Sequence, residues 1–179
     1  MKRNTFWLTV IAGCAVVAVS CEGTKVSEPT SSRDVEARGL IGGNGGPKPI
    51  SCPTQDSYSS TAEVGVLGGI LSAGGMTVSI PAGALLGTQT VTLSVPASNN
   101  VEIDVSVAGA EHFVFEQPIV VTISYARCNA TSLNLTPITA WYFNTETGEL
   151  IEPMISVDNK LLRTVTFTTG HLSGYILAN

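Results

Sequence analysis

Short segments that alternate apolar and polar residues run through the chain from residue 61 onward. In the clearest of them, Met76, Val78 and Ile80 alternate with Thr77 and Ser79. Successive side chains of a strand point to opposite faces, so this pattern predicts a strand with one buried face. The same reasoning predicts about nine strands, at residues 62–67, 76–80, 90–95, 101–105, 111–115, 119–125, 140–143, 161–168 and 174–178.

Turn residues separate these strands at short intervals, as at Pro81-Ala82-Gly83 and Ser98-Asn99-Asn100, and leave no room for long helices. Strands with one apolar face must stack on a second sheet, so residues 61–179 predict an all-β, Greek-key antiparallel sandwich. Pro118 should begin a strand or lie at an edge, because it has no backbone N–H to donate. The expected core consists of Val78, Ile80, Val91, Leu93, Phe113, Phe115, Val121, Ile123, Trp141, Phe143, Val165, Phe167 and Tyr175.

Composition agrees with a strand-rich protein, and charge excludes nucleic acid as a partner. The 179 residues include 20 Thr and 19 Val, and only 13% are charged. Beta-branched side chains suit a pleated sheet. Residues 61–179 carry 3 basic and 9 acidic side chains, a net charge of -6. Nucleic acid is therefore excluded as a partner, and free anionic ligands should be repelled.

The first 20 residues have the pattern of a secretory signal. Lys2 and Arg3 precede an apolar run of 14 residues, from Phe6 to Val19, and small residues follow. The run is shorter than the roughly 20 residues that a transmembrane helix needs. We therefore expect residues 1–20 to direct export rather than to remain as a membrane span.

The end of this segment, Ala18-Val19-Ser20-Cys21, resembles the lipobox of bacterial lipoproteins. The resemblance implies cleavage before Cys21 and a diacylglyceryl group on its thiol, with the chain held at a membrane of the cell envelope. In a cell with two membranes, it implies the outer membrane. Cys14 matches the box locally but leaves too short an apolar stretch for export. The alternative is an ordinary signal peptide with an incidental cysteine.

Residues 21–60 are predicted to form a flexible tether. Between residues 22 and 60, Gly, Pro and Ser supply 17 of 39 residues. Such a segment loses much chain entropy on ordering and has little apolar area to offset the loss. A phosphate-binding loop is a poor alternative, because Lys48 lies between two prolines and no helix start follows it.

Several segments of the domain, in order, resemble the ZU-five-type β-sandwich of ankyrins, netrin receptors and tight-junction scaffold proteins. They are Gly69-Ile70-Leu71, residues 78–85 with the sequence VSIPAGAL, residues 90–93, and residues 115–123. The run Ile-Pro-x-Gly-Ala-Leu is the most specific, since it encodes a strand, a proline stop and a glycine turn. The resemblance covers residues 66–123 and implies a scaffold for surface interactions. Fold alone does not set the partner.

His171-Leu172-Ser173 resembles the self-cleavage site of adhesion-receptor domains. The resemblance implies that His171 takes the proton of Ser173, whose oxygen attacks the carbonyl of Leu172 to give an ester that water opens. The cysteines and tryptophan that flank the adhesion-receptor site are missing here. The alternative is that His171 caps a turn before Tyr175 enters the core.

Cys52 and Cys128 are the thiols that remain after processing and acylation. Disulfides persist in exported proteins, so a bridge between Cys52 and Cys128 is one expectation, and two free thiols are the other. The bridge would join the predicted tether to the loop that follows Tyr125.

No metal or cofactor site is predicted. Glu111-His112 and Glu102-x-Asp104 are single pairs, whereas zinc requires three or four ligands. Calcium between Glu102, Asp104 and the turn at 99–100 is an alternative to a solvated acidic face. The common hydrolase and zinc-protease motifs are also missing from the sequence.

Together these patterns predict a membrane-anchored lipoprotein whose β-sandwich is a non-catalytic interaction or structural module, with an unidentified protein or glycan as partner. Two alternatives come from other classes. One is a domain that cleaves itself between Leu172 and Ser173. The other is a carbohydrate-binding module in which an outward-facing Tyr142 stacks on sugar, with Trp141 and Phe143 in the core.

Overall fold

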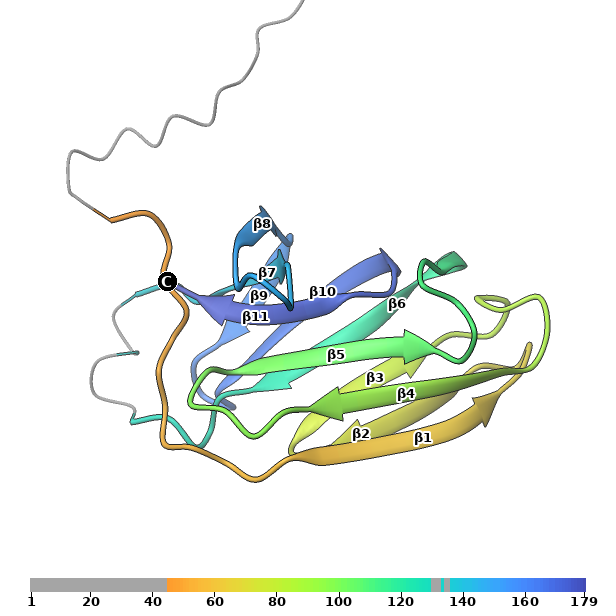
Figure 1. Ribbon diagram of the computed structural model, residues 1–179, viewed down its shortest axis with the longest axis horizontal. Helices are drawn as coiled ribbons and strands as arrows, with labels where there is room; N and C mark the ends of the chain where they lie inside the picture. Colours follow the sequence, from red (N-terminus) through yellow and green to blue (C-terminus); the bar gives the residue numbers. More distant parts are fainter. Residues whose placement is uncertain (1–44, 130–132, 134–135) are drawn as a thin grey trace, which may run out of the picture. The chain divides into compact units, whose positions relative to one another are not determined.

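The computed structural model describes residues 45–129, 133 and 136–179. They form two antiparallel sheets packed face to face, which confirms the all-β sandwich (Figure 1). The six-stranded sheet has the order β1-β4-β5-β11-β7-β8 and the five-stranded sheet the order β2-β3-β6-β10-β9. The strands are β1 (Tyr58–Val64), β2 (Gly69–Ala73), β3 (Met76–Ile80), β4 (Gln89–Val95), β5 (Glu102–Val107), β6 (Val114–Ser124), β7 (Thr139–Phe143), β8 (Leu150–Pro153), β9 (Ser156–Asn159), β10 (Thr164–His171) and β11 (Gly174–Ala178).

The core forms where the apolar faces of the two sheets meet. The alternating positions of β3, β4 and β6 are almost fully buried, as predicted from their period of two. The rings of Phe167 on β10 and Tyr175 on β11 meet across the sandwich with centroids 4.9 Å apart. Burial of this apolar surface is the main force that holds the sheets together.

Two segments that were predicted as separate strands form one strand. The segments 111–115 and 119–125 merge into β6, which runs through Pro118 in the middle of the five-stranded sheet. The expectation that Pro118 begins a strand or lies at an edge is therefore wrong. Pairing between β3 and β6 extends only from Thr122 to Val120, so the ladder with β3 ends before the proline. On the other side, the register of β10 shifts between Thr169 and His171.

Short strands account for most of the difference between the predicted nine strands and the eleven observed. The predicted list omits β2, β8 and β9, which have only four or five residues each. Near the predicted strand 161–168, the chain turns at residues 160–163 and β10 extends to His171. Few residues alternate in such short strands, so periodicity gives little signal there.

The folded unit includes residues earlier in the chain than residue 61, where the domain was predicted to begin. Ile50 and Cys52 are buried in the core, and the backbone N–H of Ile50 donates to the carbonyl of Leu177 at 3.0 Å. The end of the predicted tether is thus part of the sandwich. Residues 1–44, which hold the predicted signal peptide, Cys21 and the rest of the tether, lie outside the described residues.

The run Ile80-Pro81-Ala82-Gly83 ends β3 as its sequence suggests. Gly83 has φ 79°, a conformation that glycine adopts without strain, and its N–H donates to the carbonyl of Val66 at 2.8 Å. The turn therefore fastens the loop after β3 to the turn between β1 and β2.

Candidate functional site

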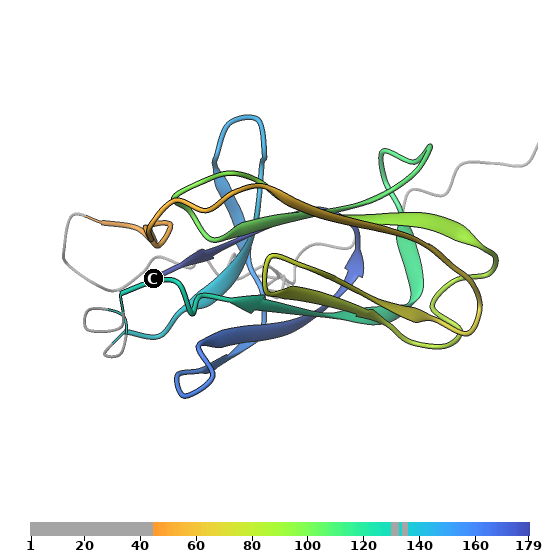
Figure 2. The ribbon, with the colours of Figure 1, turned by 90° about the horizontal axis from the view of Figure 1, so that it is seen from below.

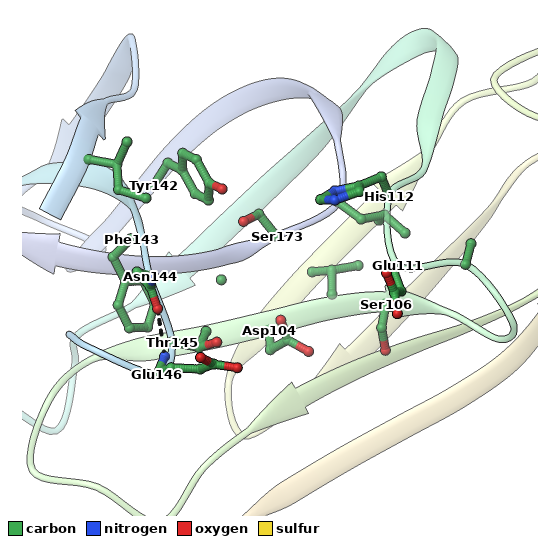
Figure 3. Close-up of a pocket in the computed structure, with 15 residues that line it drawn as sticks. Asp104, Ser106, Glu111, His112, Tyr142, Phe143, Asn144, Thr145, Glu146 and Ser173 are labelled. Carbon is green, nitrogen blue, oxygen red and sulfur yellow. Dashed lines mark hydrogen bonds between the residues drawn. The ribbon is translucent and has the colours of Figure 1, made fainter. Parts of the chain in front are cut away.

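A pocket of about 670 Å³ opens in the six-stranded sheet where β11 begins, between β5 and β7 (Figure 3). Its walls come from β5, the β5–β6 loop, the β7–β8 turn and the β10–β11 turn. The polar residues that line it are Asp104, Ser106, Glu111, His112, Tyr142, Asn144, Thr145, Glu146 and Ser173. Four separate segments of the chain thus contribute polar groups to one cavity.

Asp104 lies at the centre of the pocket, and the Thr145–Glu146 turn lies beside it (Figure 3). Its neighbours Ile103 and Val105 face the core, so strand alternation turns Asp104 toward the outer face of the sheet. Burial raises the pKa of the Asp104 carboxyl above its ordinary value, because the site holds the charged form less well than water does. The sequence-based interpretation of Asp104 as a solvated face missed this partial burial.

The β7–β8 turn holds Thr145 and Glu146 in place through Asn144. The Oδ1 atom of Asn144 accepts hydrogen bonds from the backbone N–H of Glu146 at 2.8 Å and of Thr147 at 3.1 Å. Gly148, with φ 74°, closes the turn and donates to the carbonyl of Asn144. An asparagine side chain that imitates a backbone turn in this way fixes the loop locally.

Gly174 forms the floor of the pocket next to Asp104, its partner in the β5–β11 ladder. A Cβ atom at this position would lie 2.4 Å from Cγ2 of Thr145 and 3.0 Å from Cε1 of Phe143. Only glycine lets the turn and the Phe143 ring pack directly on β11. This close packing is not visible in the sequence, where Gly174 appears only as a residue before the last strand.

A second cavity of about 680 Å³ continues the pocket across the outer face of the six-stranded sheet. It shares Asp104, Phe143 and Thr145 with the first, and it reaches β4 and the start of β1. Its added polar residues are Ser57, Tyr58, Ser59, Ser94 and Glu102. The two cavities together form a groove, called the acidic groove below, lined by carboxylates, hydroxyls and the Phe143 ring.

The structure corrects the prediction for two of the three aromatic residues of β7, Trp141 and Tyr142. Ala140 is fully buried in the core, and Tyr142 packs against the core cluster two positions further on. Trp141 and Phe143 therefore point to the outer face, where Phe143 covers Gly174. Phe143 is buried, as predicted, at 6% exposed. Trp141 is only partly buried and lies outside the core cluster, so its prediction as a core residue is wrong, and Tyr142 packs against the cluster rather than facing outward. Three aromatic residues in succession do not reveal which of them faces inward.

The structure does not bring the side chains of His171 and Ser173 together in one site. The His171 ring packs against Tyr142, with centroids 5.6 Å apart, and against Tyr175 at 6.4 Å. Ser173 lines the pocket, where the imidazole that shares the cavity is that of His112 (Figure 3). The His171–Ser173 cleavage site stays a prediction from the sequence.

A disulfide joins Cys52 to Cys128, with their Cα atoms 4.6 Å apart. The bridge lies beside Arg127, whose guanidinium donates to the carbonyls of Pro53 and Asn100. These contacts fasten the segment before β1 to the loop after β6.

Within the described ranges, no group of three or more His, Cys, Asp or Glu residues is placed to hold a metal ion. Arg127 interacts electrostatically with Glu102, the first residue of the predicted calcium set. No helix in this part of the chain is long and apolar enough to span a membrane. Cys21, the predicted lipidation site, lies outside the described residues.

Comparison with known proteins adds no relative: no family model matches the chain, and no curated protein matches it.

Proposed function

We propose that this protein is a lipoprotein, held at a membrane of the cell envelope through Cys21, whose sandwich binds a partner without catalysing a reaction. The small residues before Cys21 and the apolar run that precedes them support the anchor. The order of the segments between residues 66 and 123 supports kinship with ZU-five-type interaction domains.

The acidic groove is the observation that carries the binding role. Asp104, Glu111 and Glu146 line one cavity, and Glu102 lines its continuation. Carboxylates accept hydrogen bonds and repel anions. The groove therefore favours a neutral or cationic partner that carries donors.

The anchor is tested by expressing the full precursor in a lipoprotein-processing bacterium and measuring the intact mass and N-terminal peptide of the membrane-extracted chain. Acyl chains on Cys21 and an unbroken chain through Asn179 are expected. Cys21→Ala should release the folded protein from membranes after a salt wash. An unlipidated N-terminus would contradict the anchor, and a chain that ends at Leu172 would favour self-cleavage instead.

A carbohydrate is the partner class that the groove favours as a second candidate function. The Asp104 carboxyl and Thr145 line both cavities, Ser106 lines the first and Ser94 lines the second. Sugars carry many hydroxyl donors, and the carboxylate and hydroxyl acceptors of the groove match them. Tyr142 lines the first cavity and is partly buried against the core cluster.

Glycan-array binding by the intact chain tests this candidate. Asp104→Asn keeps the shape of the side chain and removes its charge, so it should weaken binding about tenfold or more through the loss of charge-assisted hydrogen bonds. Glu149→Gln is the matched control, because Glu149 is exposed on the same β7–β8 turn and does not line the pocket. Flat binding curves against all glycans, or equal losses in both variants, would contradict a sugar site here.

A further inference from the structure

The turn between β9 and β10 presents two leucines to solvent. Leu161 is 91% exposed and Leu162 66% exposed. The turn is nevertheless well defined, since Asn159 Oδ1 accepts a hydrogen bond from the N–H of Leu162 at 3.0 Å and Arg163 has φ 52°. An ordered turn loses little conformational freedom on binding. Two exposed leucines on such a turn suit insertion into an apolar phase.

Basic residues flank these leucines on both sides. Arg163 donates from Nη1 to the carbonyl of Ala126 at 3.3 Å, and its guanidinium has five N–H donors in all. The Lys160 ammonium pairs with Asp158 at 2.7 Å and donates to the carbonyls of Leu133 and Thr136, so these groups occupy its three donors. In the part of the chain that the structure describes, the other two Lys and Arg residues are Lys48 and Arg127.

The chain that leads back to Cys21 enters the sandwich at the same end. The backbones of Lys48 and Asn179 exchange two hydrogen bonds, of 3.0 and 3.1 Å. The Asn179 side chain donates to Thr136 Oγ1 at 3.1 Å, and Lys160 Nζ donates to the carbonyl of Thr136. Figures 1 and 2 both show the β9–β10 turn at the end where the C-terminus and residue 45 lie.

We infer that the β9–β10 turn inserts Leu161 and Leu162 into the surface of the membrane that holds the chain, with the Arg163 guanidinium at anionic lipid headgroups. The inference rests on the proposed anchor at Cys21. Leucine side chains enter the boundary between headgroups and acyl chains, and basic residues beside them bind lipid phosphates. The acidic groove, which repels such lipids, stays available to a partner in solution.

The predicted tether makes a weak insertion effective. From Cys21 to Gly45 the chain advances 24 residues, and a flexible chain of that length has a root-mean-square span of about 27 Å. The entry point at Lys48 would therefore stay near the bilayer. Tethering converts insertion into an intramolecular event with a high effective concentration.

The opposite end of the sandwich offers a matched control. Leu67, in the turn between β1 and β2, is 87% exposed, and Leu86, between β3 and β4, is 83% exposed. Figure 1 shows the β1–β2 turn at the far end from the C-terminus. The charged residue nearest to Leu67 in sequence is Glu63. Apolar exposure is thus similar at both ends, whereas basic residues flank only Leu161 and Leu162.

The experiment uses the full processed chain in vesicles of phosphatidylglycerol and phosphatidylethanolamine. Leu161→Cys and Leu67→Cys each introduce a thiol for an environment-sensitive fluorophore, because Cys52 and Cys128 are paired and Cys21 is proposed to be acylated. Nitroxide-labelled lipids should quench the label at position 161 several-fold more than the label at 67. Phosphatidylcholine vesicles, or the added change Arg163→Gln, should reduce the quenching at 161 at least twofold.

The mass of the N-terminal peptide separates the two proposals. An acylated chain with equal quenching at both positions, or with stronger quenching at 67, overturns the insertion and leaves the anchor intact. A chain without acyl groups on Cys21 overturns the anchor itself. Equal quenching in anionic and neutral vesicles overturns the role given to Arg163.

Discussion

Tyr175 fastens the turn between β10 and β11 from inside the sandwich. Its hydroxyl donates to the carbonyl of His171 at 2.9 Å and shares a hydrogen bond of 2.8 Å with the hydroxyl of Thr169. Thr169 is itself only 4% exposed, so these groups depend on one another for hydrogen bonds. The His171 backbone thus has a structural role that the sequence does not show.

The ionisation of Tyr175 should limit stability at high pH. Burial raises its pKa to about 12, with the charges of Tyr142 and Asp104 adding to the effect. Between pH 10 and about 12 the unfolded chain ionises this tyrosine while the folded chain keeps it neutral, so the free energy of unfolding falls as pH rises. Tyr175→Phe should make this fall shallower and cost about 1–3 kcal/mol at pH 7. Urea unfolding at pH 7 and between pH 10 and about 12 measures the free energy of unfolding of both chains. The exposed Tyr58→Phe is the control and should keep the stability and the pH dependence of the native chain.

Asp158 connects three segments at the other end of the sandwich. It accepts hydrogen bonds from the Tyr125 hydroxyl at 2.7 Å and the Ile138 N–H at 3.0 Å, and it pairs with Lys160. Burial raises the pKa of the Asp158 carboxyl, but the hydrogen bonds from Lys160, Tyr125 and Ile138 outweigh that effect and hold it below the ordinary value. The carboxylate is 11% exposed, so the charge is stabilised chiefly by these partners.

Asp158→Asn should therefore lower the free energy of unfolding by about 1–3 kcal/mol at pH 7. A depressed folded-state pKa contributes stability above the unfolded pKa of about 3.9, and this contribution is lost as pH falls through the folded value. The variant should accordingly lose less stability than the native chain below pH 4. Urea titrations at pH 7 and pH 3 give both values, and the exposed Asp56→Asn provides the control. A variant with native stability at pH 7 would contradict the role of this cluster.

At the scale of elements, β11 and the β7–β8 turn must touch for the pocket to exist. Gly174→Ala would place a methyl group against Thr145 and Phe143, and such overpacking costs about 1–3 kcal/mol. Thr145→Ser removes the closest methyl group, so the double variant should recover part of the loss. Gly170→Ala is the control, since nothing lies within 4 Å of its Cβ position. Thermal unfolding of the four variants measures the coupling between positions 174 and 145. If the stability changes of the two single variants simply add in the double variant, the β7–β8 turn moves freely relative to β11.

Alternation along the chain predicts most of the longer strands, but it does not always predict which side chains of a strand point to the core. In β3 and β4 the apolar residues share one face, so the period of two also identifies the core. In β7 every residue from Ala140 to Phe143 is apolar or aromatic, and the pairing with β8 shifts by one residue after Tyr142. In β7, the neighbouring strands decide which side chains point to the core, and the local sequence does not specify those neighbours. The acidic groove was missed for the same reason, because its residues come from segments far apart in the chain.

At the scale of the whole molecule, the last part of the predicted tether belongs to the domain, although its composition does not indicate this. Residues 45–57 are rich in Pro and Ser, yet Pro49 pairs with Ala178 and Ile50 is 2% exposed. Two apolar side chains, Ile50 and Cys52, carry this segment into the core. A composition average over residues 21–60 dilutes that signal. The domain boundary is therefore set by a few buried contacts rather than by the character of the segment.

The Cys52–Cys128 bridge should stabilise this junction by restricting the unfolded chain. The paired residues are 76 apart in sequence, and closing a loop of that size contributes about 2–4 kcal/mol. Replacing both cysteines with serine should lower Tm by roughly 10 °C. Cys52 and Cys128 are both buried, so serine at these positions would also bury two hydroxyls. Replacing both cysteines with alanine removes the bridge without that added cost. If reduction of the native protein leaves Tm unchanged, the segment is held instead by Ile50 and by the bonds of Arg127 to Pro53 and Asn100, and the bridge contributes little to stability.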